Sequence, residues 1–303
     1  MRDMADANSN VPPPQPSRMR RVARLRPWVQ AAFLGVWLGP FGLRLHSIPS
    51  CVFHCYACPL ASFACPVGVA AQFSALHVVP VLALGVVVTV AAMVGAMVCG
   101  WACPFGFLQD LAARVPTPKL KLPSWTGYFR YVVLVGLVLA IPYWLGESHP
   151  LFFCSVCPAG ALEGAVPNVA TQISSGAEDI GWPSAAKIAI LGVFVVAIFF
   201  TWRPWCTLFC PLGAIFSLCN RVSFLFMRFR ADQCNDCDLC RDLCKYRGPG
   251  ERRGGDLRCI RCLDCVRCRA ISVGTVFDRP DGPELVQIAP PQAPGKPAAQ
   301  PPS

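Results

Sequence analysis

Nineteen cysteines determine what chemistry this 303-residue chain can carry, and most of them stand in pairs with two or three residues between them. Two sets of four lie near the C-terminus. The first ladder is Cys234, Cys237, Cys240 and Cys244, and the second ladder is Cys259, Cys262, Cys265 and Cys268. Thiolates at this spacing converge on one metal centre, and four thiolates are the usual ligand set of an iron–sulfur cluster. The two ladders therefore predict two [4Fe-4S] clusters.

The spacing of the first ladder, C-x2-C-x2-C-x3-C, is that of bacterial two-cluster ferredoxins, in which each ladder takes its fourth ligand from the other. We therefore expect Cys244 to join the second ladder and Cys268 to join the first. Two details depart from that pattern, because Lys245 replaces the proline after Cys244 and only two residues separate Cys265 from Cys268. Zinc is the alternative, since C-x2-C pairs also build zinc sites. Eight cysteines without a histidine favour iron–sulfur.

A second motif, Cys-Pro-x-Gly, occurs four times, beginning at Cys65, Cys103, Cys157 and Cys210. The pattern C-x3-C-P at 99–104 recurs at 206–211, about one hundred residues later, each time after an apolar run. Two halves of such a repeat bring equivalent ends together when they pair. We expect an inner four-thiolate metal site made of Cys99, Cys103, Cys206 and Cys210. The alternative is that these strings merely end helices, because proline cannot continue a helix and glycine often follows one.

The opposite ends of the repeat predict a second, outer metal site. Its ligands are expected to be Cys154 and Cys157 with two of Cys51, Cys55, Cys58 and Cys65. In an oxidising compartment some of these thiols could instead form disulfides. The four histidines, His46, His54, His77 and His149, flank the same loops and could shape a quinone pocket. The remaining Cys219 stands in an apolar stretch and is expected to be a buried small residue.

The elements that position these cysteines are predicted to be membrane helices. Hydrophobic residues make up 54% of the chain and charged residues 15%, whereas a soluble domain carries about 25% charged residues. Four apolar runs, at about 28–45, 76–98, 128–146 and 185–202, approach the ~20 residues that cross a bilayer. The net charge of +10 comes largely from arginines beside these runs, so it indicates membrane topology and not a nucleic-acid partner.

Loop charges orient the predicted helices. Segments 46–76 and 147–184 contain no Lys or Arg, whereas 99–127 contains Arg114, Lys119 and Lys121. By the positive-inside rule, both termini and the middle loop are cytoplasmic. We therefore expect a multi-pass protein of the inner (cytoplasmic) membrane.

These observations predict an all-α membrane protein with four transmembrane helices arranged as two repeated helix pairs, plus a small cytoplasmic ferredoxin-like domain with two [4Fe-4S] clusters. The expected organisation is a disordered basic segment at 1–27, a four-helix membrane domain at 28–202, the ferredoxin-like domain at 203–278 and a disordered Pro-rich tail at 279–303. One or two further clusters are expected in the membrane domain.

The strings Cys-Gly-Trp-x-Cys-Pro-Phe-Gly at 99–106 and Cys-x3-Cys-Pro-Leu-Gly at 206–213, followed by the ferredoxin ladders, resemble the NapH-type membrane polyferredoxins. The arrangement is also similar to the membrane part of NosR and to MauN-like and CcoG-like proteins, over roughly residues 76–270. The resemblance implies an electron-transfer subunit of an oxidoreductase, with quinol dehydrogenation as one such activity. It would relay electrons between the quinone pool, or a cytoplasmic donor, and a partner redox enzyme.

Two other functions compete with electron transfer. A maturation factor that loads metal into a partner oxidoreductase would also use spare outer thiols, and a purely structural anchor would need no cluster-sized sets of cysteines. The sequence contains no P-loop, Rossmann glycine motif or Ser-His-Asp pattern, so hydrolysis and nucleotide chemistry are not supported.

Overall fold

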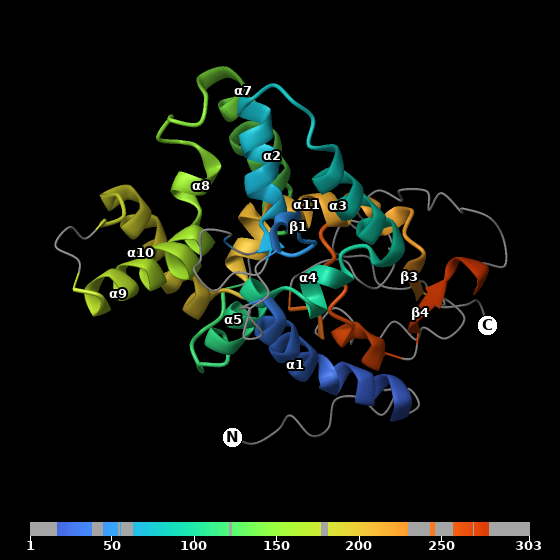
Figure 1. Ribbon diagram of the computed structural model, residues 1–303. Helices are drawn as coiled ribbons and strands as arrows, with labels where there is room; N and C mark the ends of the chain where they lie inside the picture. The colour runs from blue at the N-terminus through green and yellow to red at the C-terminus, as the bar shows by residue number, and fades with distance from the viewer. Residues whose placement is uncertain are drawn as a thin grey trace, which may run out of the picture.

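The computed structural model describes residues 17–37, 45–53, 55, 63–120, 123–176, 181–229, 243–245, 257–268 and 270–278, and this part of the chain is mostly helical (Figure 1). Four of the expected ligands, Cys58, Cys234, Cys237 and Cys240, lie outside the described residues, as do His54, residues 1–16 and residues 279–303. The mostly helical fold is confirmed for the described part. Two expectations are corrected: residues 17–27 of the segment expected to be disordered are helical, and the domain expected to be all-α contains a two-stranded sheet, Leu45–Pro49 with Phe63–Ala64.

Helix α1 (Ser17–Trp37) begins before the first apolar run and contains Pro27, and the chain is already a strand, β1 (Leu45–Pro49), where that run was expected to end. Two polar side chains of α1 explain its position. Arg26 Nε and Gln30 Nε2 both donate to the Gly100 carbonyl oxygen, at 2.9 Å each. These buried bonds hold α1 against α4 (Met97–Trp101), next to the first C-x3-C-P string.

The segment after β1 turns back into the molecule. Strand β2 (Phe63–Ala64) pairs in parallel with β1, and α2 (Pro66–Ala75) then runs beside α7 (Ile141–Leu145). The Gln72 side chain donates to the Glu147 carboxylate, and this bond joins the far ends of α2 and α7. Cys65 is therefore buried at the start of α2.

Three apolar helices coincide with the last three expected spans. They are α3 (Val81–Val94), the continuous helix Trp125–Leu145 and α10 (Ala185–Phe200). Only Trp125–Leu145, among the described residues, is long and apolar enough to cross a membrane. Its pieces are η1 (Ser124–Tyr128), α6 (Phe129–Val133), the π-helical η2 (Leu134–Ala140) and α7. The wider π turn precedes Pro142, whose missing N–H and ring would disturb a regular α-helix.

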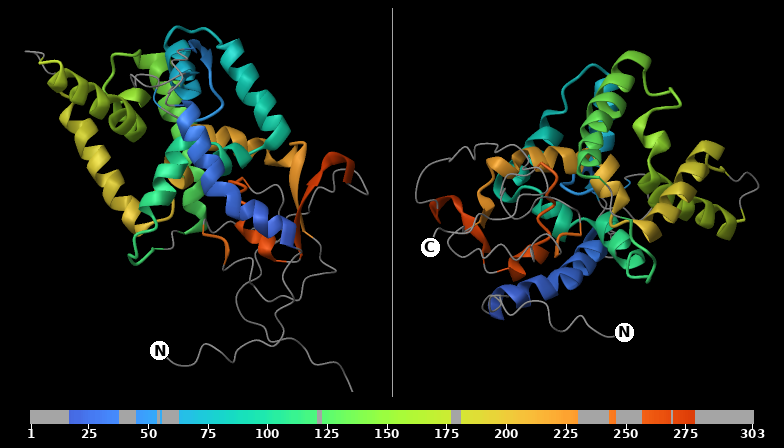
Figure 2. Two further views of the ribbon diagram at one scale, coloured as in Figure 1. Left: turned by 60° about the horizontal axis from the view of Figure 1, so that its bottom comes forward. Right: turned by 180° about the vertical axis from the view of Figure 1, so that it is seen from behind.

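These helices present large apolar side chains outward. More than half of the side-chain surface is exposed at Val81, Leu82, Val88, Met93, Val132, Val135, Val193 and Val196. In the left view of Figure 2, α3 and α10 run along opposite sides of the molecule. An apolar surface of this extent marks a membrane or protein contact.

The second half of the chain repeats the first. Helices α8 (Phe153–Val156), η3 (Gly160–Ala165) and α9 (Val166–Ser174) precede α10. The π-helical η4 (Trp205–Phe209), α11 (Pro211–Leu218) and η5 (Cys219–Arg221) follow it, as α4 and α5 (Pro104–Ala112) follow α3.

A small sheet carries the second ladder. Strand β3 (Leu225–Phe229) pairs antiparallel with β4 (Ile271–Thr275), and the ladder cysteines, η7 (Asp264–Arg267) and η8 (Val276–Asp278) adjoin this pair. Arg261 fixes the ladder to the helices, because its Nη1 donates to the Val94 carbonyl oxygen (3.0 Å) and its Nη2 to that of Asn220 (2.6 Å). Asn220 in turn donates to the Cys259 carbonyl oxygen (2.9 Å).

Candidate metal centres

All four Cys-Pro-x-Gly strings begin a helical segment. In Cys65, Cys103, Cys157 and Cys210 the backbone φ lies between −74° and −68° and ψ between 110° and 121°. Proline occupies the first helical position, where its missing N–H costs nothing. Cys157 and Cys210 also end the preceding helical segments, so these strings stand between two helical segments and do not merely end one.

The glycine of the motif bonds the cysteine sulfur. Gly106 N–H donates to Cys103 Sγ (3.4 Å), and Gly213 N–H donates to Cys210 Sγ (3.3 Å). A helix N-terminus carries a partial positive charge and free N–H groups, so it favours a thiolate at this position. The motif therefore places the cysteine sulfur at the N-terminal end of a helix, inside the molecule, where a thiolate that can bind metal is favoured.

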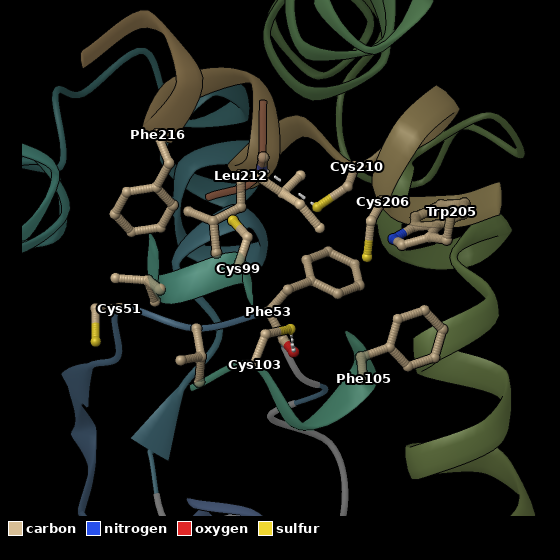
Figure 3. A pocket seen from close by; sticks show the side chains of 14 residues that line it. Cys51, Phe53, Cys99, Cys103, Phe105, Trp205, Cys206, Cys210, Leu212 and Phe216 are labelled. Atoms are coloured by element: carbon tan, nitrogen blue, oxygen red, sulfur yellow. Dashed lines mark hydrogen bonds between the residues drawn. The ribbon is translucent and has the colours of Figure 1, made fainter. Parts of the chain in front are cut away.

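The inner thiol group, defined as Cys99, Cys103, Cys206 and Cys210, lines one small cavity of about 10 Å³ (Figure 3). Two of its cysteines come from the α4–α5 turn and two from the η4–α11 turn. The expected meeting of the two halves is therefore present in the structure. Among the described residues, no three His, Cys, Asp or Glu side chains converge closely enough to hold a single metal ion. The four thiols surround a space, in which the Phe53 ring lies (Figure 3).

Unsatisfied donors around this cavity fit a negatively charged, sulfur-rich group. Trp205 Nε1, which lines the cavity, and Arg130 Nε and Nη1 are buried without a hydrogen-bond partner. Gln109 Nε2 donates to Cys206 Sγ at 3.3 Å. Buried donors are rarely left unpaired, so these orphans indicate a missing acceptor. A [4Fe-4S] cluster held by the inner thiol group would bring acceptor sulfurs. The cluster together with its four thiolates would carry a net negative charge. The Phe53 ring would have to move aside to admit it.

Burial controls the protonation of the inner thiols. It raises the pKa of Cys99 to about 12, and it raises the pKa of Cys206 and, strongly, that of Cys210. Neighbouring thiols add to the effect at Cys99 and Cys210. Metal ligation requires thiolates, so a bound group must supply the positive charge, and its binding releases protons.

An ion-pair network supports the inner thiol group from behind. Arg203 is fully buried, and its Nε and Nη2 donate to both carboxylate oxygens of Asp110, at 2.7 and 2.5 Å. Its Nη1 donates to the Cys99 carbonyl oxygen (2.8 Å). Arg26 Nη2 also bonds Asp110 (2.6 Å). Although burial alone would raise it, the pairing with Arg203 and then Arg26 holds the pKa of Asp110 below its usual value.

A second cavity, of about 340 Å³, is lined by Cys55, Cys65, Cys154 and Cys157, which we call the outer thiol group. These four cysteines lie close enough for each charge to act on the others, as the pKa of Cys157 shows: burial raises it first, and Cys65, Cys154 and Cys55 raise it further. The sequence did not decide which two of the four cysteines of the first outer loop join Cys154 and Cys157. In the structure, Cys55 and Cys65 line the same cavity as that pair. Cys51 lines the inner cavity instead, with its sulfur turned away from the other four (Figure 3).

The second ladder forms a third group with its expected partner from the first. Burial raises the pKa of Cys265 well above its ordinary value, and Cys262, Cys259 and Cys244 raise it further in that order. Cys244 therefore lies with the second ladder. Cys268 is buried in a separate small core with Trp101 and Ile271. Its expected partners lie outside the described residues, and its role as a ligand stays a prediction.

Several functional residues had no recognisable signal in the sequence. Asp110, Gln109, Arg130 and Arg203 are ordinary polar residues near helix ends, and nothing in their spacing distinguishes them from surface charges. Phe53 lines both cavities, and it is one of nineteen phenylalanines. His77, in contrast, packs edge to face against the Tyr143 ring, and His149 accepts a hydrogen bond from the Leu151 N–H. The quinone role considered for the histidines stays a prediction.

The fold and the thiol groups define a protein that binds 4Fe-4S clusters. The family model described as "4Fe-4S binding domain" matches residues 76–123 and 185–230, which contain both halves of the inner thiol group. Uncharacterized protein MJ0750 of Methanocaldococcus jannaschii is 30% identical over 60% of this chain and 72% of that protein. No solved structure gives a significant match.

Two further relatives carry descriptive names. Ferredoxin-type protein NapH of Haemophilus influenzae is 25% identical over 84% of each chain. Methylamine utilization ferredoxin-type protein MauN of Methylorubrum extorquens is 28% identical over 61% of this chain and 56% of that protein. The chain belongs to the family of 4Fe-4S ferredoxin-type proteins that includes NapH and MauN. The resemblance seen in the sequence motifs is confirmed.

Proposed function

We propose that this protein is a membrane-bound electron carrier. It takes electrons one at a time through a ferredoxin-like module, passes them to a cluster between its helices and delivers them to a partner redox enzyme. The quinone pool or a soluble carrier is the electron source or sink at one end. The chemistry of the thiol groups and the ferredoxin-type relatives support this proposal.

One observation carries it: the second ladder lies directly against the inner cavity. Ile260, between two ladder cysteines, lines that cavity with the inner thiol group. Gly100, between two inner cysteines, packs so closely that an added Cβ would come within 2.8 Å of the Ile260 carbonyl oxygen. The site of the second ladder and the inner site therefore adjoin each other at Ile260, close enough for electrons to pass between clusters bound there.

The surrounding residues would set the redox properties. A bound cluster supplies a one-electron centre whose potential depends on net charge, hydrogen bonds to sulfur and solvent exposure. Gln109 and the glycine N–H groups donate to the sulfurs, the unpaired Trp205 Nε1 lines the same cavity, and Arg130 and Arg203 add positive charge. Phe105, Leu212 and Phe216 exclude water from the cavity.

Metal content is the first test. The full chain, purified anaerobically in detergent, is expected to contain about twelve iron and twelve sulfide ions when the inner site and both ladders are filled, and about sixteen with an outer cluster. Its clusters should titrate reversibly in one-electron steps by electron paramagnetic resonance, and the reduced protein should exchange electrons with a quinone in liposomes. A value near eight iron would leave the inner site empty. Zinc without iron would overturn the proposal, and stable clusters without electron exchange would favour a maturation role.

The membrane placement is a second proposal, supported by Trp125–Leu145, by the exposed apolar faces of α3 and α10 and by the loop charges. A reporter that is active only outside the cytoplasm, inserted into the full chain, is expected to be active at Ser74 or Ser175 and inactive at Pro118. The lysines and Arg114 of the middle loop keep that loop inside. Reversed activities would place the ladders on the outer side and contradict this orientation.

A further inference from the structure

We infer that the outer thiol group, Cys55, Cys65, Cys154 and Cys157, holds a [4Fe-4S] cluster of its own beside the inner one. None of these four cysteines falls within residues 76–123 or 185–230, the segments that match the 4Fe-4S family model. The site therefore needs its own argument. Only its role in passing electrons rests on the proposed function.

The local geometry repeats that of the inner thiol group. Cys65 and Cys157 precede Pro-x-Gly at the start of helical segments, with φ and ψ within about 11° of those of Cys103 and Cys210. Each group also takes one Cys-Pro-x-Gly string from each half of the repeat. The same backbone device that presents inner sulfurs thus presents two outer sulfurs to one cavity.

The cavity has the space and the charge for such a group. It measures about 340 Å³, and the motif glycines Gly68 and Gly160 form part of its wall. The Lys187 side chain lines it as well, and its ammonium would lie 3.7 Å from a Cβ added at Gly160. The inner thiol group has the same arrangement of a cation next to the glycine of the string: Arg203 lies beside Gly106, and Arg130 lies beside Gly213. A four-thiolate cluster carries net negative charge, which such a cation offsets.

The choice among the outer cysteines follows from how Cys55 is held. Its backbone N–H donates to Glu163 Oε2 at 2.9 Å, which joins the first outer loop to η3 in the other half of the repeat. Cys154 and Cys157 both lie shortly before η3 in the sequence. Cys51, four residues earlier, faces the inner cavity wall and is thereby excluded from the outer set.

A single residue separates the two sites. Phe53 lines both the inner and the outer cavity, and its carbonyl oxygen accepts a hydrogen bond from Cys103 Sγ at 3.7 Å. One electron leaving the reduced inner cluster can therefore enter the oxidised outer cluster across Phe53, and that step needs no other reactant. The outer cluster would extend the path from the second ladder toward the opposite face.

Three single variants of the full chain test the site: Cys55→Ser, Cys65→Ser and Cys157→Ser. Each is expected to lose about four iron and four sulfide ions per chain and the same paramagnetic signal, because a four-iron cluster missing one thiolate is poorly held. The inner and ladder signals should remain, and they report that each variant is folded. Cys55 is the least buried of the three, so Cys55→Ser is the variant least able to act through misfolding.

Cys219→Ser is the matched control, since it changes a cysteine that lines neither cavity, and it should keep the wild-type iron content. Wild-type iron in all three test variants would overturn the site, as would titration showing the outer thiols oxidised in pairs. If the outer cluster were intact but the protein exchanged no electrons, the assignment of the outer site would be supported and the proposed function would be overturned. Loss of the inner signal alone in these variants would identify the changed cysteine as an inner ligand and would overturn the outer assignment.

Discussion

Cys103→Ser and Cys210→Ser are expected to abolish the same cluster signal, although the two residues stand 107 positions apart in the sequence. Each sulfur accepts an N–H bond from the glycine of its own string, and both line the inner cavity. A cluster that loses one of four thiolates is poorly held, so either change should release about four iron ions per chain. The double variant should lose little more, because residues that act as one unit are non-additive.

Cys219→Ser is the matched control for this pair. Cys219 follows α11, only partly buried and outside the inner cavity, so its replacement should leave the iron content and all signals unchanged. The ladder signals should survive in all these variants. If Cys103→Ser and Cys210→Ser removed different signals, the two halves of the repeat would hold separate centres and the shared inner site would be wrong.

The sequence was sufficient for the parts of the site that depend on covalent spacing. The repeat of C-x3-C-P near residues 99 and 206 predicted that two helix ends would meet, and the four sulfurs line one cavity. Ferredoxin spacing likewise placed Cys244 with the second ladder. Such motifs are readable because a few residues of backbone fix the position of each sulfur.

Contacts between segments far apart in the sequence determine the positions of α1 and of the outer loop, which the spacing of residues along the sequence does not predict. Helix α1 lies against Gly100 because Arg26 and Gln30 share one carbonyl oxygen, and hydropathy alone places a membrane span further along. The outer loop was expected on the membrane face opposite the inner site, with no separation between the two sites fixed by the sequence. In the structure α2 turns this loop inward, so that Phe53 lines both cavities. Packing between segments far apart in sequence leaves no local pattern.

Asp110→Asn is expected to destabilise the protein by about 3–5 kcal/mol, because removing one partner of a buried ion pair leaves the other charge uncompensated. Arg203 is fully buried and would lose the carboxylate that two of its nitrogens contact. Arg26 would lose its shortest ion pair. Thermal unfolding in detergent measures the loss. The inner signal should shift or weaken as well, because Arg203 also bonds the Cys99 carbonyl oxygen, whereas the ladder signals should persist.

Asp264→Asn is the matched control. Its carboxylate lies 3.5 Å from Arg26 and 3.9 Å from the half-exposed Lys245, longer contacts than those of Asp110, so its replacement should cost less stability than that of Asp110. The pH dependence gives a second readout. The pKa of Asp110 is lower in the folded chain than its unfolded value of about 3.9, so its contribution to stability is present above that pH and is lost as the pH falls through the folded pKa. Asp110→Asn should remove this part of the acid sensitivity. Equal effects of the two substitutions would show that the Asp110 network does not support the inner site.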